Sequence, residues 1–290
     1  MKTELTEKEK IQHGNMVWDI MRTKNDGEEI IFLHGNSSSY NSFMPLFESS
    51  LAERYQLIAI NLPGHGETSL PLGDHITIPE IANMASELIL HITKGRYLVV
   101  GHSLGGHVLS HALHRLKHCL GLILISAPPI SMQTMADAFL PDPSDGALFS
   151  ENLSEEQIHR MAEALLGSQK DNKSLLDVLV GSINNTQGHF RKALGLSLQA
   201  GNLKDELAML SLTKVPVALI WGTNDKFIRE DFYRNIILER TLGKGKYAIE
   251  GAGHSPHLED VPHFQRLLSN LCLEISLVSG CTSRRRLNAL

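Results

Sequence analysis

Residues 97–106 read YLVVGHSLGG, and this stretch decides the expected fold. The apolar run from Tyr97 to Val100 is typical of a strand buried on both faces, and an amphipathic helical pattern begins at Leu104. A serine in a tight strand-to-helix turn needs strained backbone geometry, and glycines two residues before and after it remove side chains that would collide there. The stretch therefore predicts a nucleophile elbow with Ser103 at its tip.

Short runs rich in Ile, Val and Leu recur along the chain and alternate with amphipathic stretches. The predicted strands are residues 16–22, 30–33, 57–60, 97–100, 122–125, 217–220 and 247–249, and the predicted helices are residues 40–53, 78–92, 104–118, 229–240 and 261–275. Such alternation predicts an α/β protein with a mostly parallel sheet of eight-stranded type and helices on both of its faces.

The alternation breaks between residues 128 and 212, where helical patterns at 151–166, 172–180 and 188–200 follow one another without a buried strand. A segment inserted after the strand at 122–125, which we take as the sixth of an eight-stranded sheet, must return to the sheet, and it would lie over the carboxyl ends of the strands. We therefore expect a core domain of residues 1–128 and 213–278 and a helical cap of residues 129–212. Residues 279–290 are expected to be a flexible tail.

Composition excludes several classes of function. The 290 residues carry a formal net charge of −5, so no global basic field would attract nucleic acid or an anionic membrane. Three scattered cysteines do not make a disulfide framework or a CxxC metal site. The charged N-terminus does not resemble a secretory signal, and no apolar run is long enough to span a bilayer. We expect a cytoplasmic protein with no nucleic-acid partner and no membrane insertion; its oligomeric state is left open.

A serine hydroxyl is a poor nucleophile, so a base must take its proton and a carboxylate must orient that base. Asp225 follows the predicted strand at 217–220, and His254 follows the next predicted strand within a Gly-Ala-Gly-His loop. The two residues are 29 positions apart, which leaves room for one helix and one strand between two loops at the same sheet edge. The sequence thus predicts a catalytic triad of Ser103, Asp225 and His254.

Other residues compete for two of these roles. Asp231 and Asp260 are the alternative acids, and Asp225 is favoured by its position directly after a strand. His257 is the alternative base, and His254 is favoured because it follows the glycine loop immediately.

The loop at residues 34–39 follows another predicted strand and supplies the other half of an oxyanion hole. The backbone N–H of Asn36 is the favoured donor, with Ser37 second, and the N–H of Leu104 is the donor at the elbow. Candidates for the substrate pocket are His34, His102, Phe139, Phe149 and Met161.

Four histidines share one face of the helix after the elbow: His107, His111, His114 and His118. No carboxylate-rich motif and no HExxH string accompanies them, so a partly buried and partly solvated helix face is favoured over a metal site. We expect no metal and no cofactor.

Five motifs in order, HGN, NLPGHG, GHSLGG, WGTND and GAGH, resemble the α/β-hydrolase fold superfamily over residues 14–275. Within it, the stretches HGNSSS, LPGHGET, SLGGH, APP and KFIREDF are most similar to the metal-independent N-acyl-homoserine lactonases, which open the lactone ring of acylated homoserine lactones. The resemblance implies a nucleophile at Ser103, an acid at Asp225, a base at His254 and an oxyanion donor at Asn36. In that group the acid can be Glu, and the cap, where substrate choice resides, matches in patches.

The expected function is serine hydrolysis of an ester or a lactone, with an acyl-homoserine lactone as one candidate substrate. A general carboxylesterase or thioesterase for short to medium acyl chains is the alternative. A non-catalytic relative that binds a small hydrophobic ligand under its cap is a second alternative, disfavoured because every catalytic element is present.

Overall fold

The computed structural model describes residues 5–70 and 76–278 of the chain. Within these residues, eight strands form one sheet in the order β1-β2-β4-β3-β5-β6-β7-β8. The strands are β1 (Thr6–His13), β2 (Met16–Thr23), β3 (Glu28–Leu33), β4 (Tyr55–Ile60), β5 (Tyr97–His102), β6 (Cys119–Ile125), β7 (Val217–Gly222) and β8 (Thr241–Ile249). Strands β3 to β8 are parallel to one another, and β2 is antiparallel to both β1 and β4. The predicted eight-stranded, mostly parallel sheet is confirmed.

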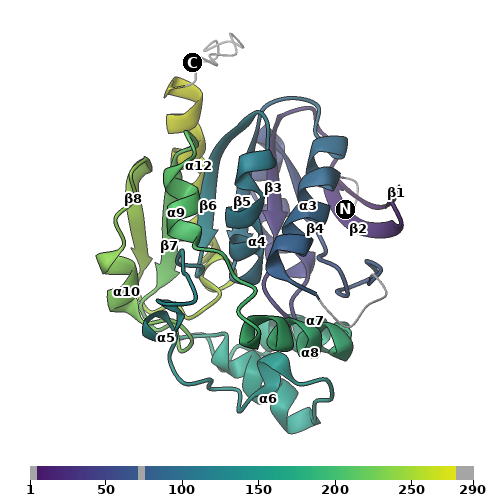
Figure 1. The fold of residues 1–290 in the computed structure, drawn as a ribbon. Coiled ribbons are helices and arrows are strands. Elements are labelled where there is room, and N and C mark those ends of the chain that lie inside the picture. Colours follow the sequence, from purple (N-terminus) through teal and green to yellow (C-terminus); the bar gives the residue numbers. More distant parts are fainter. Residues whose placement is uncertain (1–4, 71–75, 279–290) are drawn as a thin grey trace.

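Helices cover both faces of this sheet (Figure 1). They are α1 (Met44–Phe47), α2 (Leu51–Arg54), α3 (Ile78–Ile92), α4 (Leu104–Ala112), α5 (Met135–Ala138), α6 (Glu155–Ala164), α7 (Lys173–Asn184), α8 (Gly188–Gln199), α9 (Glu206–Ser211), α10 (Glu230–Asn235), α11 (Pro256–Glu259) and α12 (Val261–Val278). Short 3₁₀ helices are η1 (Tyr40–Phe43), η2 (Leu113–Arg115) and η3 (Ala147–Phe149).

Strand β5 shows why both faces need a cover. Val99 belongs to the hydrophobic cluster beneath α3 and α4, whereas Leu98 and Val100 belong to the cluster on the opposite face, beneath α1 and α12. Because successive side chains of a strand point to opposite faces, a continuous apolar run supplies two cores at once. This is the pattern on which the prediction of buried strands depended.

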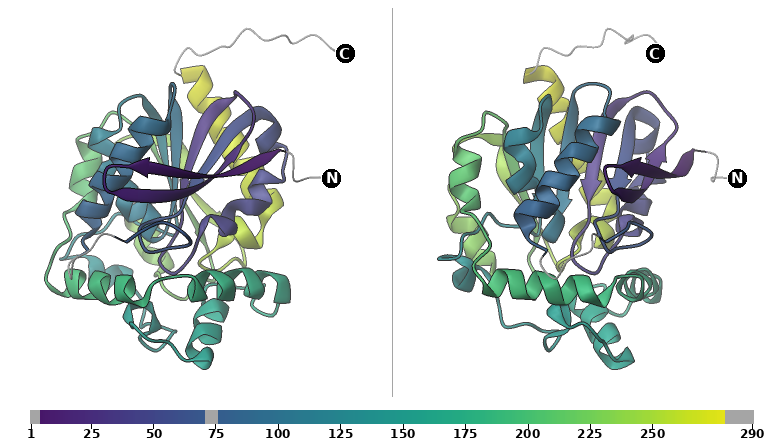
Figure 2. Two further views of the ribbon diagram at one scale, coloured as in Figure 1. Left: turned by 90° about the vertical axis from the view of Figure 1, so that its right-hand side faces the viewer. Right: turned by 45° about the vertical axis from the view of Figure 1, so that its right-hand side comes forward.

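The structure differs from the predicted elements at two places near the N-terminus. Strand β1 was not predicted, because its sequence TEKEKIQH alternates charges; it is a half-exposed edge strand that pairs with β2. The helix predicted at 40–53 is broken into η1, α1 and α2, with Pro45 in the first turn of α1, where its missing N–H is tolerated. Figure 2 shows the β1–β2 hairpin crossing in front of the other strands.

Helices α5 to α9 lie between β6 and β7 in the sequence, as the predicted insertion requires. Helices α6, α7 and α8 gather across one end of the sheet in both views of Figure 2. Helix α9 instead contacts α4 on a face of the sheet. The exact domain boundaries, 1–128 and 213–278 for the core and 129–212 for the cap, stay a prediction, and the predicted tail lies outside the described residues.

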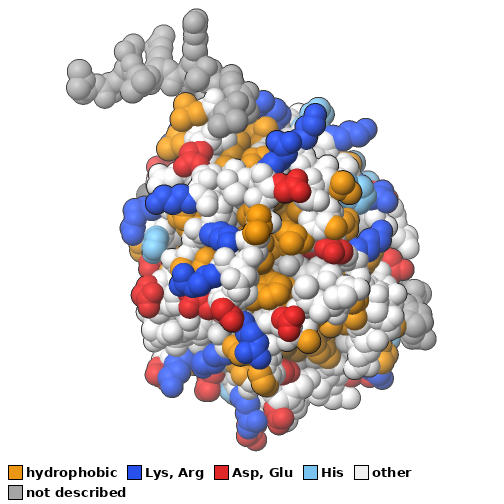
Figure 3. Space-filling view, turned by 60° about the vertical axis from the view of Figure 1, so that its left-hand side comes forward, with side chains coloured by type: hydrophobic (Ala, Val, Ile, Leu, Met, Phe, Trp, Pro, Cys, Tyr) orange, Lys and Arg blue, Asp and Glu red, His pale blue; other side chains and the backbone are white. Residues whose placement is uncertain are grey.

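On the face shown in Figure 3, Lys and Arg side chains are interspersed with Asp and Glu side chains around a central band of hydrophobic side chains. This face therefore carries no field of a single sign that would recruit a polyanion. None of the described helices is long and apolar enough to cross a bilayer.

Candidate active site

The turn after β5 is closely packed around its glycines. Ser103 has φ 49° and ψ −120°, a conformation outside the main regions for residues with a side chain. A Cβ at Gly101 would lie 2.5 Å from Gly106 Cα, and a Cβ at Gly105 would lie 2.3 Å from the carbonyl oxygen of Leu33. Only glycine fits at these two positions, so the packing of the turn explains the spacing of glycines around Ser103.

Asp225 and His254 meet at the same edge of the sheet, in the loops after β7 and β8. His254 Nδ1 donates to Asp225 Oδ2 over 2.8 Å, and both side chains are buried. The other carboxylate oxygen accepts from the backbone N–H groups of Phe227 (2.8 Å) and Ile228 (3.2 Å). A carboxylate held in this way fixes the proton on Nδ1 and leaves Nε2 of His254 as a proton acceptor.

The competing candidates lie elsewhere. Asp231 is exposed on α10, and Asp260 contacts His263. His257 is fully buried against the rings of Phe43 and His102, and neither of its nitrogens has a hydrogen-bond partner in the described part of the chain. Burial lowers the pKa of His257 to about 3, so this ring stays neutral.

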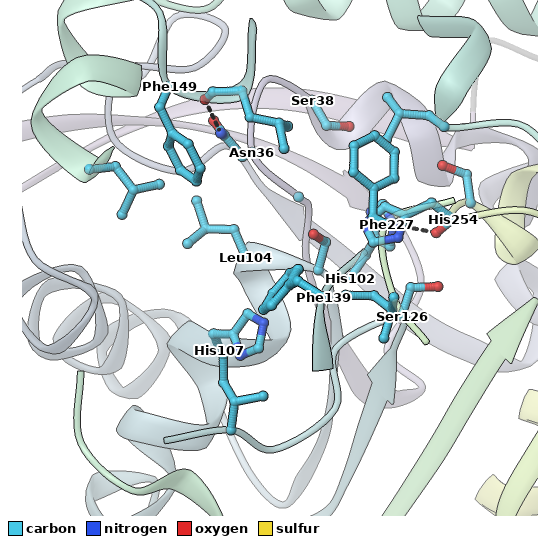
Figure 4. Close-up of a pocket in the computed structure, with 18 of the residues that line it drawn as sticks. Asn36, Ser38, His102, Leu104, His107, Ser126, Phe139, Phe149, Phe227 and His254 are labelled. Carbon is cyan, nitrogen blue, oxygen red and sulfur yellow. Dashed lines mark hydrogen bonds between the residues drawn. The ribbon is translucent and has the colours of Figure 1, made fainter. Parts of the chain in front are cut away.

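A pocket beneath the cap joins the candidate residues (Figure 4). Of the predicted site residues, the pocket lining includes Asn36, His102, Ser103, Leu104, Phe139, Phe149 and His254. The remaining lining is mostly apolar and comes from both the core and the inserted segment, for example Ile130, Met135, Leu148, Leu179 and Leu194. Ser103 and His254 therefore face one apolar cavity that the inserted segment encloses.

Two predicted pocket residues lie outside this lining. His34 is fully buried behind the loop: its Nδ1 donates to Gly35 O (2.8 Å), and its Nε2 accepts from Leu62 N (3.0 Å). Burial lowers the pKa of His34 to about 4, and its role is to hold the loop after β3. Met161 has no exposed surface and packs in the apolar core beneath α6.

The loop after β3 lies directly against the turn. A Cβ at Gly35 would be 3.1 Å from Ser103 Cβ, which brings the backbone of Asn36 beside the candidate nucleophile. The N–H of Ser37 donates to His65 Nε2 over 3.0 Å, so the alternative oxyanion donor is already engaged. Leu104 is the first residue of α4, where a backbone N–H has no partner within the helix.

His102, which precedes the candidate nucleophile, links the elbow to the base. Its Nε2 donates to the carbonyl oxygen of His254 over 2.8 Å, and the two ring centroids are 5.2 Å apart. Burial holds the pKa of His102 well below its usual value, so the ring adds no charge beside the pocket. The contact fixes the backbone from which the His254 ring projects.

The prediction that four histidines share one helix face is wrong, because α4 ends at Ala112: His114 lies in η2, and His118 has a positive φ of 67°. His107 and His111 are buried on α4, whereas His114 and His118 are exposed. The sequence analysis missed their partner: the carboxylate of Glu206, which lies 99 residues beyond His107, receives a hydrogen bond from it. Across residues 5–70 and 76–278, no group of three or more His, Cys, Asp or Glu side chains is arranged to hold a metal ion.

Two further pocket residues escaped the sequence analysis. Ser126 follows β6 with a positive φ of 47°, and its buried hydroxyl has no hydrogen-bond partner in the residues described. Phe227 packs its ring 4.9 Å from that of His254. Ser126 directly follows β6, and Phe227 lies two residues after Asp225. Both positions are at the carboxyl ends of strands, and this is the signal in the sequence that could have indicated them as pocket residues.

Comparisons with known proteins identify the family to which this fold belongs. Residues 30–263 match the model of the alpha/beta hydrolase family. The chain is 28% identical over 209 residues to the pimeloyl-(acyl-carrier protein) methyl ester esterase of Nitrosomonas europaea, which covers 71% of this chain and 80% of that protein. It is 22% identical over 230 residues to an sn-1-specific diacylglycerol lipase of Danio rerio, covering 77% of this chain and 71% of the lipase.

Among solved structures, N-acyl homoserine lactonase AidH in complex with N-butanoyl homoserine superposes with a TM-score of 0.83 at 22% identity, over 97% of this chain and 100% of that one. At this identity the likeness concerns the fold. Because the family model spans most of the sequence, the chain belongs to the alpha/beta hydrolase family.

Proposed function

We propose that the protein is a serine hydrolase that cleaves an ester or lactone bond through an acyl-enzyme. The observation that carries the proposal is the pair of His254 and Asp225, joined over 2.8 Å, in the same pocket as the strained Ser103. A buried carboxylate, an imidazole oriented by it and a serine on a strand-to-helix turn are the components of activated-serine chemistry.

In the first half of the reaction, Nε2 of His254 accepts the proton of the Ser103 hydroxyl while Oγ bonds to the substrate carbonyl carbon. The carbonyl electron pair moves onto oxygen, which accepts hydrogen bonds from the backbone N–H groups of Asn36 and Leu104. Asp225 stabilises the imidazolium that forms.

In the second half, the carbon–oxygen bond to the alkoxy group breaks, and that oxygen takes the proton from His254. A water molecule then gives its proton to His254 and attacks the acyl-enzyme, which releases a carboxylic acid and restores Ser103. With a lactone, the leaving hydroxyl stays attached to the acyl group, so the product is one hydroxy acid.

An acyl-homoserine lactone is the candidate substrate that we favour. It is supported by the match to a lactonase fold over almost the whole chain and by an apolar pocket suited to an acyl chain. A carboxylesterase is the second candidate, supported by the sequence similarity to a methyl ester esterase.

Mass spectrometry of the products tests the proposal. The purified protein is incubated with N-hexanoyl homoserine lactone and, separately, with p-nitrophenyl hexanoate, beside Ser103→Ala and Ser110→Ala variants. Ser110 lies on the same helix and its hydroxyl bonds to Gly106 O, so it controls for the loss of a serine from α4.

Addition of one water to the lactone by the wild type and by Ser110→Ala, but not by Ser103→Ala, is the expected result. Cleavage of the ester with the lactone untouched would select the esterase function. Turnover by Ser103→Ala at the wild-type rate would overturn the proposed mechanism.

A further inference from the structure

His107 is one of the polar side chains that line the pocket but are not used by the triad or the oxyanion hole. It lies one helical turn after Ser103, and its backbone N–H donates to Ser103 O over 3.2 Å. Residues four apart in a helix share a face, with their Cβ atoms about 5–6 Å apart. Figure 4 shows His107 on the side of the pocket away from His254, with Leu104 and Phe139 between them.

A buried carboxylate holds the His107 ring in place. Glu206 has no exposed surface, and it accepts hydrogen bonds from His107 Nδ1 (2.9 Å) and from the backbone N–H of Ile130 (3.0 Å). Its own backbone N–H donates to Ile130 O over 2.9 Å, so Glu206 fixes two pocket residues at once. Nε2 of His111 lies 3.4 Å from the other carboxylate oxygen.

The carboxylate of Glu206 remains ionised in this setting. Burial by itself would raise the pKa of Glu206, but the hydrogen bond from His107 and the nearby imidazole of His111 outweigh burial and lower the pKa below its usual value. An ionised carboxylate can accept hydrogen bonds but cannot donate them. Nδ1 of His107, which faces this carboxylate, therefore carries a proton.

Both contacts of the His107 ring with Glu206 involve Nδ1, so Nε2, on the opposite side of the ring, is not engaged by that carboxylate. In the singly protonated ring, with the proton on Nδ1, this nitrogen is an acceptor. The side chains of Leu104 and Phe139, which lie between His107 and His254 in Figure 4, are apolar. The pocket thus has a catalytic end, an apolar middle and, at His107, a polar group that Glu206 holds in place.

We propose that His107 is a specificity-determining residue that accepts a hydrogen bond from a hydroxyl or amide N–H in the acyl part of the substrate. The inference rests on the proposed ester or lactone hydrolysis, and it names the substrate class as acyl groups that carry a second, hydrogen-bond-donating group. From the spacing of residues one turn apart, that group falls at roughly carbons 3 to 8 of the acyl chain.

The test compares p-nitrophenyl octanoate with its 3-hydroxy, 6-hydroxy and 8-hydroxy derivatives. The measured quantity is the ratio of kcat/KM for each hydroxylated ester to kcat/KM for the unsubstituted ester. At one of these positions the wild type is expected to give a ratio of roughly 10, the effect of one buried hydrogen bond.

Three variants separate specificity from structural support. His107→Asn keeps a donor near the position of Nδ1 for Glu206 but removes Nε2, so the ratio is expected to approach one. His107→Gln carries its amide out to the reach of Nε2 and is expected to restore part of the preference. His111→Asn changes the other histidine beside Glu206, which does not line the pocket, and is expected to keep the wild-type ratio.

A wild-type ratio near one at every position would overturn the inference, and so would a preference that His107→Asn leaves intact. Equal loss of the preference in His111→Asn would also overturn it, because the effect would then belong to the support of Glu206. Labelling by a fluorophosphonate reports the proposed hydrolase chemistry separately. A labelled protein without a preference refutes the inference, and an unlabelled protein that cleaves no ester refutes the proposed function as well.

Discussion

The strained backbone of Ser103 predicts an unusual order of stability between two inactive variants. At φ 49° and ψ −120° a residue with a Cβ costs about 1–3 kcal/mol, whereas glycine adopts this region freely. Glycine also increases the conformational entropy of the unfolded chain, which lowers the free energy of unfolding by about 0.4–1 kcal/mol. Ser103→Gly is therefore expected to be more stable than Ser103→Ala by about 1 kcal/mol, although both lack the hydroxyl.

Chemical unfolding at equilibrium measures this difference, and a thermal scan should show Ser103→Gly melting about 2–4 °C higher. Ser110, in the interior of α4, is the matched control. At this position the helical backbone favours alanine over glycine. The free energy of unfolding of Ser110→Ala should therefore be about 1 kcal/mol higher than that of Ser110→Gly. If Ser103→Ala is as stable as Ser103→Gly while the control behaves as expected, the turn is not strained and the account of the elbow is refuted.

Three further predictions concern the acid, a glycine of the turn and the buried histidines. Asp225→Asn should lower kcat for a p-nitrophenyl ester by roughly 10³- to 10⁴-fold, because an amide donor favours the wrong tautomer of the base; a loss below tenfold would argue against the assigned acid. Gly105→Ala should lower the free energy of unfolding by about 2–3 kcal/mol, since its Cβ would lie 2.3 Å from Leu33 O, and urea unfolding with an unchanged midpoint would contradict this. Burial lowers the pKa of His34 to about 4 and of His257 to about 3, so between these values and about 6.5 the unfolded chain binds more protons than the folded one. Stability should therefore fall as pH is lowered from 6.5 to 4.5, by about 2–3 kcal/mol for each of the two groups, and His257→Phe should show a shallower slope in denaturant titrations; an unchanged slope would exclude this ring as a cause.

The strands of the core could be predicted because apolar runs such as that of β5 serve two hydrophobic clusters at once. Helix α3 could also be predicted, since its amphipathic pattern starts at the capping box of Thr77 and Glu80. The edge strand β1 could not be predicted, because an exposed edge strand needs few apolar residues. Its alternating charges give no indication that it pairs with β2.

The candidate triad could be predicted because each member lies in the turn or loop that follows a strand, and the carboxyl ends of parallel strands meet at one edge. The direction of a side chain within a loop could not be predicted. His34 follows β3 as a site residue would, but its ring points to the backbone of Leu62. Long-range partners were equally hidden, because nothing near His107 in the sequence indicates Glu206.

Mapping the adduct of a fluorophosphonate tests the central claim of an activated serine most directly. The folded protein is incubated with the probe, its intact mass is measured, and the modified residue is located by peptide sequencing. The account predicts one adduct on Ser103, absent from Ser103→Ala and strongly slowed in a His254→Ala variant. Folded protein that remains unmodified, or that carries the adduct on another residue, would contradict it.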